Sequence, residues 1–250
     1  MNRIPYLSAA RFSGAEAGAF LQAQLTADIG ALDDGSATFA CYCTPKGQVL
    51  GLLRVQRSGD DYLVAAEARL LPGILQRLRM FVFRTRVEFD PAEELAVFGT
   101  AGPDYGFAPR PDEDSAPDPA WKPAELRAGI TWLGPESSER YIPQMLGFDT
   151  LGAVSFSKGC YPGQEIVARA RYLGSVKRKP LVLETDDAID PQPGEKLRLQ
   201  RGDAHYDAVV VDAAPSDAAG TVVFTVTRAG PEEPAHAFEW AGATYRCATI

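Results

Sequence analysis

The octapeptide Lys158-Gly159-Cys160-Tyr161-Pro162-Gly163-Gln164-Glu165 places one thiol between a predicted strand at 153–156 and a predicted helix at 164–172. Proline suits the first turn of a helix because its missing N–H would have no partner there, and Gly163 allows a tight bend. Apolar residues then recur at helical spacing, at Ile166, Val167 and Ala170. The octapeptide therefore predicts that Cys160 lies just before a helix N-terminus.

Cys160 has two interpretations. Near a helix N-terminus, unpaired N–H groups and the helix dipole favour an anion, so a thiol loses its proton more readily. The thiolate is the form that attacks electrophiles and binds metals, and Lys158, Arg169 and Arg171 would add positive charge. A lone cysteine is otherwise a small buried hydrophobe. Simple packing does not require two glycines, a lysine, a glutamine and a glutamate around it, so Cys160 is a candidate reactive residue.

The octapeptide, continued by Ile166-Val167-Ala168-Arg169, resembles the signature K-G-C-[FY]-x-G-Q-E of the YgfZ family. That family is related to the glycine-cleavage T-protein, an aminomethyltransferase, and includes mitochondrial iron–sulfur assembly factors. Three shorter stretches agree with the resemblance: Phe20 to Asp28, Thr44 to Gln48 and Tyr141 to Gln144. The resemblance covers most of the chain and is least specific in its C-terminal part.

The resemblance implies an α+β, T-protein-like multidomain fold, with mixed α/β N-terminal domains around a central channel and a small C-terminal β-barrel. The predicted parts are a central α+β domain of residues 1–35 and 124–175, an inserted α+β domain of residues 36–100, a proline- and acid-rich linker at 101–123, and a barrel at 178–250. Strands mixed with helices independently indicate an α+β layer in the first part. Short strands between turn residues indicate a barrel or sandwich in the last.

Local patterns predict the elements. Ser13 and Glu16 form a capping-box pattern before a helix that ends near Gly30. A second helix is predicted at 70–81, and the segment 137–145 is expected to carry a short helix before the Pro143 break. The segment 101–123 holds six prolines among acidic residues and is predicted to be exposed. Strands are predicted at 37–43, 48–56, 62–65, 85–89, 95–99, 130–133, 181–184, 196–199, 207–212, 222–227 and 244–248.

The resemblance also implies the site. The signature cysteine is the functional residue of the family, so Cys160 is the candidate catalytic residue, with Lys158 to hold its thiolate or a folate carboxylate. The cofactor implied is tetrahydrofolate or a related folate. The candidate folate-binding residues are Gln24, Tyr161, Gly163, Gln164, Glu165, Arg169 and Arg171. Gln164 and Glu165 either bind the amide-like edge of the pterin or only cap the helix. Tyr161 either stacks on a ligand or packs in the core.

The implied function is assembly or repair of iron–sulfur clusters in client enzymes, including some that modify tRNA. The expected partners are folate, these clients and assembly factors. Cys160 would ligate iron, attack an oxidised adduct or form a mixed disulfide, and the sequence does not choose among these. The alternatives are a tetrahydrofolate-dependent aminomethyltransferase of one-carbon metabolism and a non-enzymatic binding module with a structural Cys160.

The T-protein carboxylates are replaced in this chain. Gly51 and Leu52 stand where the T-protein family has acidic residues, and Arg127 falls near a second family carboxylate. Neither an apolar residue nor an arginine supplies the positioned carboxylate that acid/base work needs. We therefore do not expect a conventional aminomethyltransferase, and a folate-like cavity would persist without that activity.

Composition limits the other functions. The net charge of −8 and pI of about 4.9 argue against broad electrostatic binding of nucleic acid, so no direct binding is expected, although a local basic patch is not excluded. The sequence has no long apolar run and no signal-peptide core, so no membrane partner and a cytoplasmic location are expected. Cys41, Cys43 and Cys247 are predicted to be structural thiols, and no metal site is expected.

Overall fold

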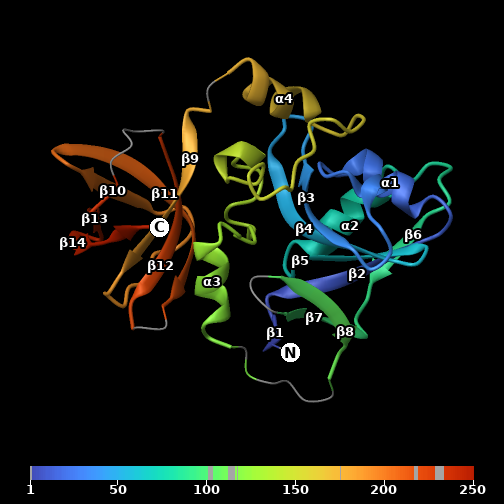
Figure 1. The fold of residues 1–250 in the computed structure, drawn as a ribbon, viewed down its shortest axis with the longest axis horizontal. Coiled ribbons are helices and arrows are strands. Elements are labelled where there is room, and N and C mark those ends of the chain that lie inside the picture. The colour runs from blue at the N-terminus through green and yellow to red at the C-terminus, as the bar shows by residue number, and fades with distance from the viewer. Residues whose placement is uncertain are drawn as a thin grey trace. The chain divides into compact units, whose positions relative to one another are not determined.

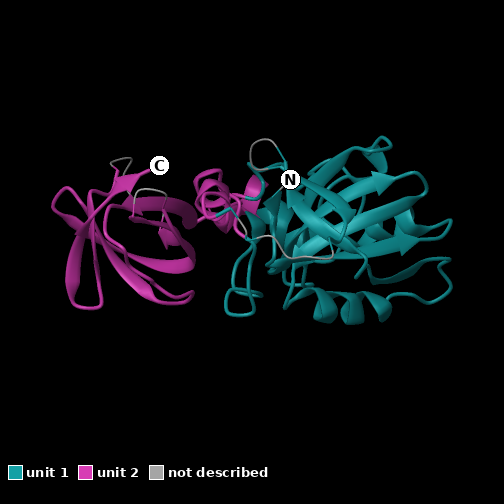
Figure 2. Ribbon diagram, turned by 90° about the horizontal axis from the view of Figure 1, so that it is seen from below, with its two compact units in different colours: residues 1–118, 132–143, 148–169 teal, residues 119–131, 144–147, 170–250 magenta. Residues whose placement is uncertain are grey.

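A computed structural model describes residues 2–100, 104–111, 116, 118–174, 176–216, 219–228 and 234–250. The chain divides into two compact units, which Figure 2 shows in different colours. Unit 1 comprises residues 1–118, 132–143 and 148–169, and unit 2 comprises residues 119–131, 144–147 and 170–250.

Unit 1 is built on a five-stranded antiparallel sheet with the order β3-β4-β5-β2-β6 (Figure 1). Its strands are β2 (Leu7–Ser13), β3 (Ala37–Cys43), β4 (Val49–Ser58), β5 (Asp61–Glu67) and β6 (Glu88–Pro91). β2 belongs to the predicted 1–35 segment and pairs with β5 of the predicted 36–100 segment, so one sheet joins the two.

Both faces of this sheet are buried. Helices α1 (Ala17–Gln24) and α2 (Leu71–Arg79) share one apolar cluster with the sheet residues Phe12, Val55 and Val64. On the other face, the Phe39 ring lies 5.8 Å from Tyr105 and 6.0 Å from Trp132. Burial on both faces explains why β3 and β4 read as nearly continuous apolar runs rather than as alternating ones.

A second, three-stranded antiparallel sheet in unit 1 has the order β1-β7-β8. It consists of β1 (Asn2–Arg3), β7 (Leu95–Gly99) and β8 (Tyr105–Pro109). β8 corrects the prediction that the whole segment 101–123 is an exposed linker. Tyr105 of β8 lies opposite Gly99 of β7. Its ring is buried because it packs against Phe39 on the face of the large sheet. Residues 101–103, 112–115 and 117 of that segment lie outside the described residues.

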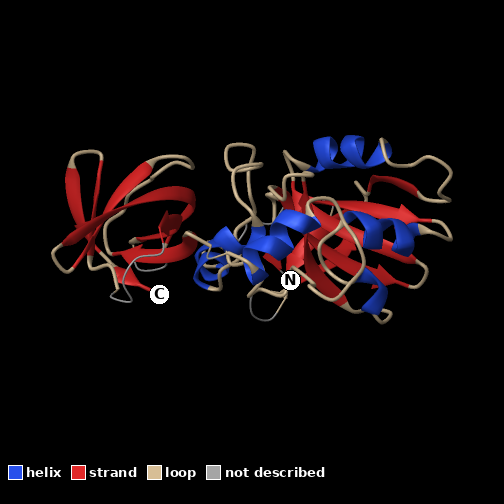
Figure 3. Cartoon of the chain, turned by 90° about the horizontal axis from the view of Figure 1, so that it is seen from above, coloured by secondary structure: helices blue, strands red, loops and turns tan. Residues whose placement is uncertain are grey.

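Unit 2 contains a seven-stranded sheet that curls into a nearly closed barrel-like shape (Figures 1 and 3). Its order is β14-β13-β10-β11-β12-β9-β15. A core that includes Leu183, Leu199, Val210, Val223 and Phe238 fills its interior. The unit also carries α3 (Trp121–Arg127). The strands are β9 (Arg178–Thr185), β10 (Lys196–Arg201), β11 (Ala204–Pro215), β12 (Thr221–Arg228), β13 (Ala237–Trp240), β14 (Ala243–Arg246) and β15 (Ala248–Thr249).

Five local predictions are wrong. Ser13 ends β2 and does not cap α1. The Glu16 carboxylate accepts the backbone N–H of Arg86 at 2.8 Å instead, because β6 brings that segment alongside. α1 ends at Gln24, and the chain turns before a short 3₁₀ helix, η1 (Ile29–Ala31). Residues 130–133 and 153–156 are buried or half-buried coil rather than strands. The short helix expected before the Pro143 break is absent, and η2 (Pro143–Met145) starts at that proline instead.

Among the described residues, no helix combines the length and the apolar character that crossing a membrane would require.

Candidate functional site

The octapeptide forms a loop in unit 1 that ends at α4 (Gln164–Tyr172), as the helix prediction required. Lys158, near its start, is only 9% exposed. Its ammonium donates to the backbone carbonyls of Gln22 at 2.6 Å, Leu25 at 2.7 Å and Ala27 at 2.7 Å. These carbonyls lie at the end of α1 and in the turn after it, where helices leave C=O groups without intrahelical partners and favour a cation. Lys158 therefore anchors the loop to α1.

The contacts of Lys158 correct its predicted role. A lysine ammonium has three N–H donors, and all three are used by the backbone of residues 22–27. None is left to hold the Cys160 thiolate or a folate carboxylate. Burial lowers the pKa of Lys158 to about 8, while the nearby Asp28 opposes that shift. The side chain is a positioning residue of the loop.

Cys160 is exposed, two residues after the buried lysine. Its neighbour Gly159 is also exposed, and a Cβ added at Gly159 would meet open space. The Cys160 side chain is therefore accessible to solvent. Cys41 and Cys43 are buried in β3, and Cys247 is half-buried in unit 2.

Gly163 closes the other end of the loop against the turn at Thr44–Gln48. Its φ of +82° is a conformation that favours glycine. A Cβ at Gly163 would lie 2.7 Å from Cα of Gly47 and would also meet the Thr44 carbonyl oxygen. Gly47 itself has φ +72°, and a Cβ there would meet the Ile166 side chain of α4 at 3.1 Å. Two backbones thus approach each other closely because both residues are glycines.

Tyr161 is buried, which supports its interpretation as a core residue. Its ring centroid lies 5.6 Å from the Lys158 ammonium. Burial raises the pKa of its hydroxyl, and the nearby thiols Cys43 and Cys41 add to this. Burial likewise raises the pKa of Cys43 to about 12 and that of Cys41 well above its usual value. These groups stay protonated at neutral pH and belong to the interior.

Gln24 is the last residue of α1 and one of the predicted folate-binding residues. Unlike the candidates on α4, it is buried. Its side chain is 9% exposed, and within the described part of the chain its Oε1 is buried without a hydrogen-bond partner. Such an atom costs free energy unless something pairs with it. The other candidates lie on α4: Gln164 is half-exposed, and Glu165, Arg169 and Arg171 are exposed.

Two residues that shape the site were not predicted. Gln22 accepts hydrogen bonds from the backbone N–H of Ile29 at 2.7 Å and of Gly30 at 3.1 Å, which closes the turn whose carbonyls bind Lys158. Thr26 is fully buried. Its hydroxyl donates to Ala153 at 2.6 Å and accepts from the Cys41 N–H at 2.7 Å. The sequence could have pointed to them only through their location, because both lie in the stretch Phe20 to Asp28 that agrees with the family resemblance.

The positions where the resemblance predicts lost T-protein carboxylates take part in packing and in an ion pair. A Cβ on Gly51 would meet Ile74 of α2 at 2.9 Å, and Leu52 is buried. Arg127 binds Glu184 through its guanidinium and contacts the Ser216 hydroxyl at 3.2 Å, all within unit 2. Arg127 lowers the pKa of Glu184, so the pair is ionised at neutral pH.

Comparison with known proteins yields no matching family model. A protein of Haemophilus influenzae described as uncharacterized is 29% identical over 75% of this chain and 74% of its own. Proteins named tRNA-modifying protein YgfZ are 29% identical in Colwellia psychrerythraea, over 78% of each chain, and 27% identical in Escherichia coli O157:H7, over 90% of this chain and 84% of theirs. The resemblance read from the octapeptide is confirmed, because these homologues cover most of the chain.

Among solved structures, the glycine cleavage system aminomethyltransferase T from Bartonella henselae superposes with a TM-score of 0.74. The match covers 98% of this chain and 83% of that one at 14% sequence identity. At this identity the likeness concerns the fold, and it confirms the T-protein-like fold.

Proposed function

We propose that this chain, a homologue of proteins named tRNA-modifying protein YgfZ, supports assembly or repair of iron–sulfur clusters in client enzymes, among them enzymes that modify tRNA. Cys160 is the residue through which it acts. One observation carries the proposal: an exposed thiol is presented on a loop fixed by the buried Lys158 before it and by Gly163 after it. An exposed sulfur on a loop held at both ends is suited to contact another protein.

The chemistry of Cys160 favours a reaction with a partner. Within the described ranges, no group of three or more His, Cys, Asp or Glu side chains could hold a metal ion. If Cys160 ligates iron, the client therefore has to supply most of the other ligands. In thiol–disulfide exchange, the Cys160 thiolate forms a bond to one sulfur of a client disulfide, and the other sulfur leaves as a thiolate with the electron pair.

Folate is the proposed cofactor, and Gln24 is the residue that fits it. A pterin ring carries N–H donors, and the buried Oε1 of Gln24 is an acceptor without a partner. When bound, a tetrahydrofolate would supply a carrier of one-carbon groups. The chain's own contribution would be orientation: Gln24 accepts a hydrogen bond from the pterin edge, and the exposed Arg169 offers charge to a glutamate tail.

The test is complementation of a bacterial strain that lacks its own YgfZ protein. We expect Cys160→Ser to abolish iron–sulfur-dependent tRNA modification, measured by mass spectrometry of digested nucleosides. Cys247→Ser is the matched control, because that thiol is half-buried in unit 2, and it should retain full function. Equal thermal unfolding of the two variants would exclude misfolding. Normal modification with Cys160→Ser would remove the thiol from the mechanism.

The fold similarity supports one second candidate, aminomethyl transfer to tetrahydrofolate. The packed environment of Gly51 and Leu52 argues against it, since neither position can provide a carboxylate. A glycine-cleavage assay with a lipoyl carrier and tetrahydrofolate decides the matter. Turnover in that assay would favour the transferase over the iron–sulfur proposal.

A further inference from the structure

An open depression of about 830 Å³ lies on the outer side of the curled sheet of unit 2. Six exposed polar or charged residues line it: Arg178, Lys196, Arg198, His205, Asp207 and Arg228. Four are lysine or arginine and only one is acidic, although the chain as a whole has a net charge of −8. The local charge of this surface is therefore opposite to that of the protein.

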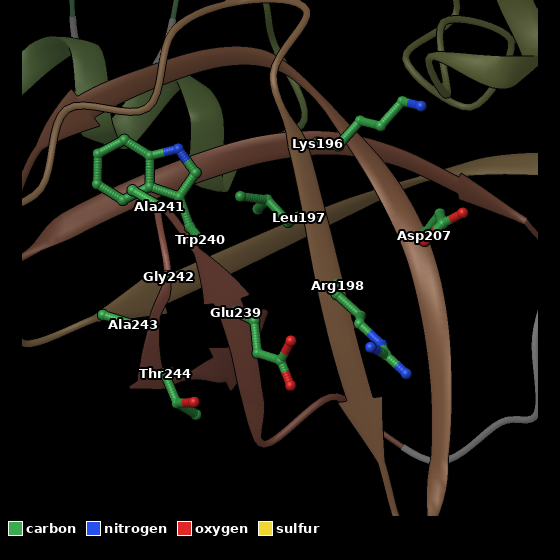
Figure 4. Close-up of a pocket in the computed structure, with 10 residues that line it drawn as sticks. All are labelled: Lys196, Leu197, Arg198, Asp207, Glu239, Trp240, Ala241, Gly242, Ala243 and Thr244. Carbon is green, nitrogen blue, oxygen red and sulfur yellow. The ribbon is translucent and has the colours of Figure 1, made fainter.

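The strand register explains how the cations come together. Arg198 of β10 pairs opposite Asp207 of β11, and Arg228 of β12 pairs opposite Arg178 of β9. Side chains two residues apart on a strand share a face, so Lys196 lies beside Arg198 on the same face. Figure 4 shows Lys196, Arg198 and Asp207 on neighbouring strands, with their side chains on the same face of the sheet. The row thus crosses four strands that are consecutive in the sheet, with cations on β10, β12 and β9 and Asp207 on β11.

This arrangement costs stability. Like charges directly opposite each other on antiparallel strands repel, and Arg178 and Arg228 are such a pair. Within the described residues, none of the four cations forms a salt bridge. Elsewhere in unit 2 a cation does have an acidic partner, since Arg127 forms a salt bridge with Glu184. The lack of salt bridges at the four cations is therefore not due to a general lack of carboxylates in the unit. An unneutralised like-charge pair indicates a surface that is matched to an external anion.

We propose that this depression binds the phosphate backbone of RNA. Three of its four cations are arginines, whose planar fork matches phosphate oxygens. Adjacent strands lie about 4.8 Å apart, so the row from Arg198 to Arg178 spans about 14 Å, or roughly four nucleotides of one strand. A protein partner would be expected to need an apolar core, whereas the apolar side chains here are Val209, Val226 and the half-buried Tyr206. Contacts from lysine and arginine to phosphates carry no sequence information, so binding should be independent of sequence.

The experiment measures binding of a fluorescein-labelled, unmodified tRNA transcript by anisotropy between 50 and 200 mM salt. Four phosphate contacts predict that log affinity falls against log salt with a slope of about −3. Arg178→Ala and Arg228→Ala should each weaken binding several-fold and make the slope shallower by about 1. Lys179→Ala is the matched control, because Lys179 is exposed beside Arg178 but alternates to the other side of β9.

The stability of the variants separates binding from folding. Removing either arginine relieves repulsion, so the Tm should stay unchanged or rise while RNA binding falls. The absence of saturable binding by the wild-type protein, or an equal loss with Lys179→Ala, would overturn the proposal. Tighter binding of poly-glutamate than of the transcript would also overturn it, because the surface would then belong to an acidic protein. The proposal does not depend on Cys160, so Cys160→Ser should bind RNA normally.

Discussion

The ammonium nitrogen of Lys158 lies 2.7 Å from the carbonyl oxygen of Leu25, although 133 residues separate them in the sequence. The same nitrogen reaches the carbonyls of Gln22 and Ala27. One buried cation therefore ties the signature loop to the end of α1. The buried Lys158 holds the loop in place, and the Cys160 thiol on the same loop is exposed.

Lys158→Met should destabilise unit 1. The variant keeps the apolar stem but leaves three carbonyls without their donor, and each unsatisfied buried group costs about 1–3 kcal/mol. We expect the free energy of unfolding, measured by urea titration, to fall by roughly 3 kcal/mol. Lys177→Met, at an exposed position, serves as the control and should change it little. Equal stability of both variants would contradict the anchoring role.

The stability that depends on Lys158 should rise with pH. Burial lowers the pKa of Lys158 from 10.5 to about 8 in the folded protein. Between these values the unfolded chain binds more protons than the folded chain, so the free energy of unfolding increases with pH. We expect the difference in unfolding free energy between wild type and Lys158→Met to grow from pH 8 to pH 10. A difference that is flat or shrinks over this range would show that the folded pKa is not depressed.

Gly163→Ala should be far more damaging than Gly159→Ala, four positions earlier in the same loop. Alanine at φ +82° is strained by roughly 1–3 kcal/mol, and its Cβ would collide with Gly47. At Gly159 a Cβ meets open space. Thermal unfolding should show a large fall in Tm for the first variant and almost none for the second. Similar Tm values would mean that the turn at Thr44–Gln48 moves aside freely.

Two glutamines of α1 should respond in opposite ways. Gln24→Leu removes a buried acceptor without a partner, so we expect stability to rise by about 1 kcal/mol and tetrahydrofolate affinity to fall. Gln22→Leu removes the acceptor for two backbone N–H groups and should lower stability. Calorimetry of folate binding and thermal unfolding measure both effects. Unchanged folate affinity in Gln24→Leu would exclude Gln24 from the ligand site.

The four thiols should differ sharply in reactivity. At pH 8, a short exposure of the native protein to iodoacetamide should label Cys160 first, because it is exposed. Cys247 should follow slowly, since burial raises its pKa to about 11, and Cys43 should react only after unfolding, since its pKa is raised to about 12. Peptide mass spectrometry reports the order. Early labelling of Cys43 would show that β3 opens in the native state.

Sequence patterns predicted elements well where local chemistry agreed with the final environment. The predicted strand at 37–43 and helix at 164–172 coincide with β3 and α4, because apolar runs and a Pro-Gly entry act over a few residues. Local patterns failed where a distant segment competed. Glu16 had a backbone donor from Arg86 within reach, and the segment 101–123 contains a strand because Tyr105 could fill a space beneath Phe39.

The octapeptide, with three shorter stretches that agree with it, predicted the resemblance to YgfZ proteins, the T-protein-like fold and Cys160 as the candidate reactive cysteine. The role of each neighbour was decided only in three dimensions. Lys158 became an anchor, Tyr161 a core residue and Gln24 a buried acceptor, because hydrogen-bond partners and burial depend on segments more than 100 residues away. The basic row of unit 2 likewise exists only through strand register, which brings Arg178 of β9 opposite Arg228 of β12.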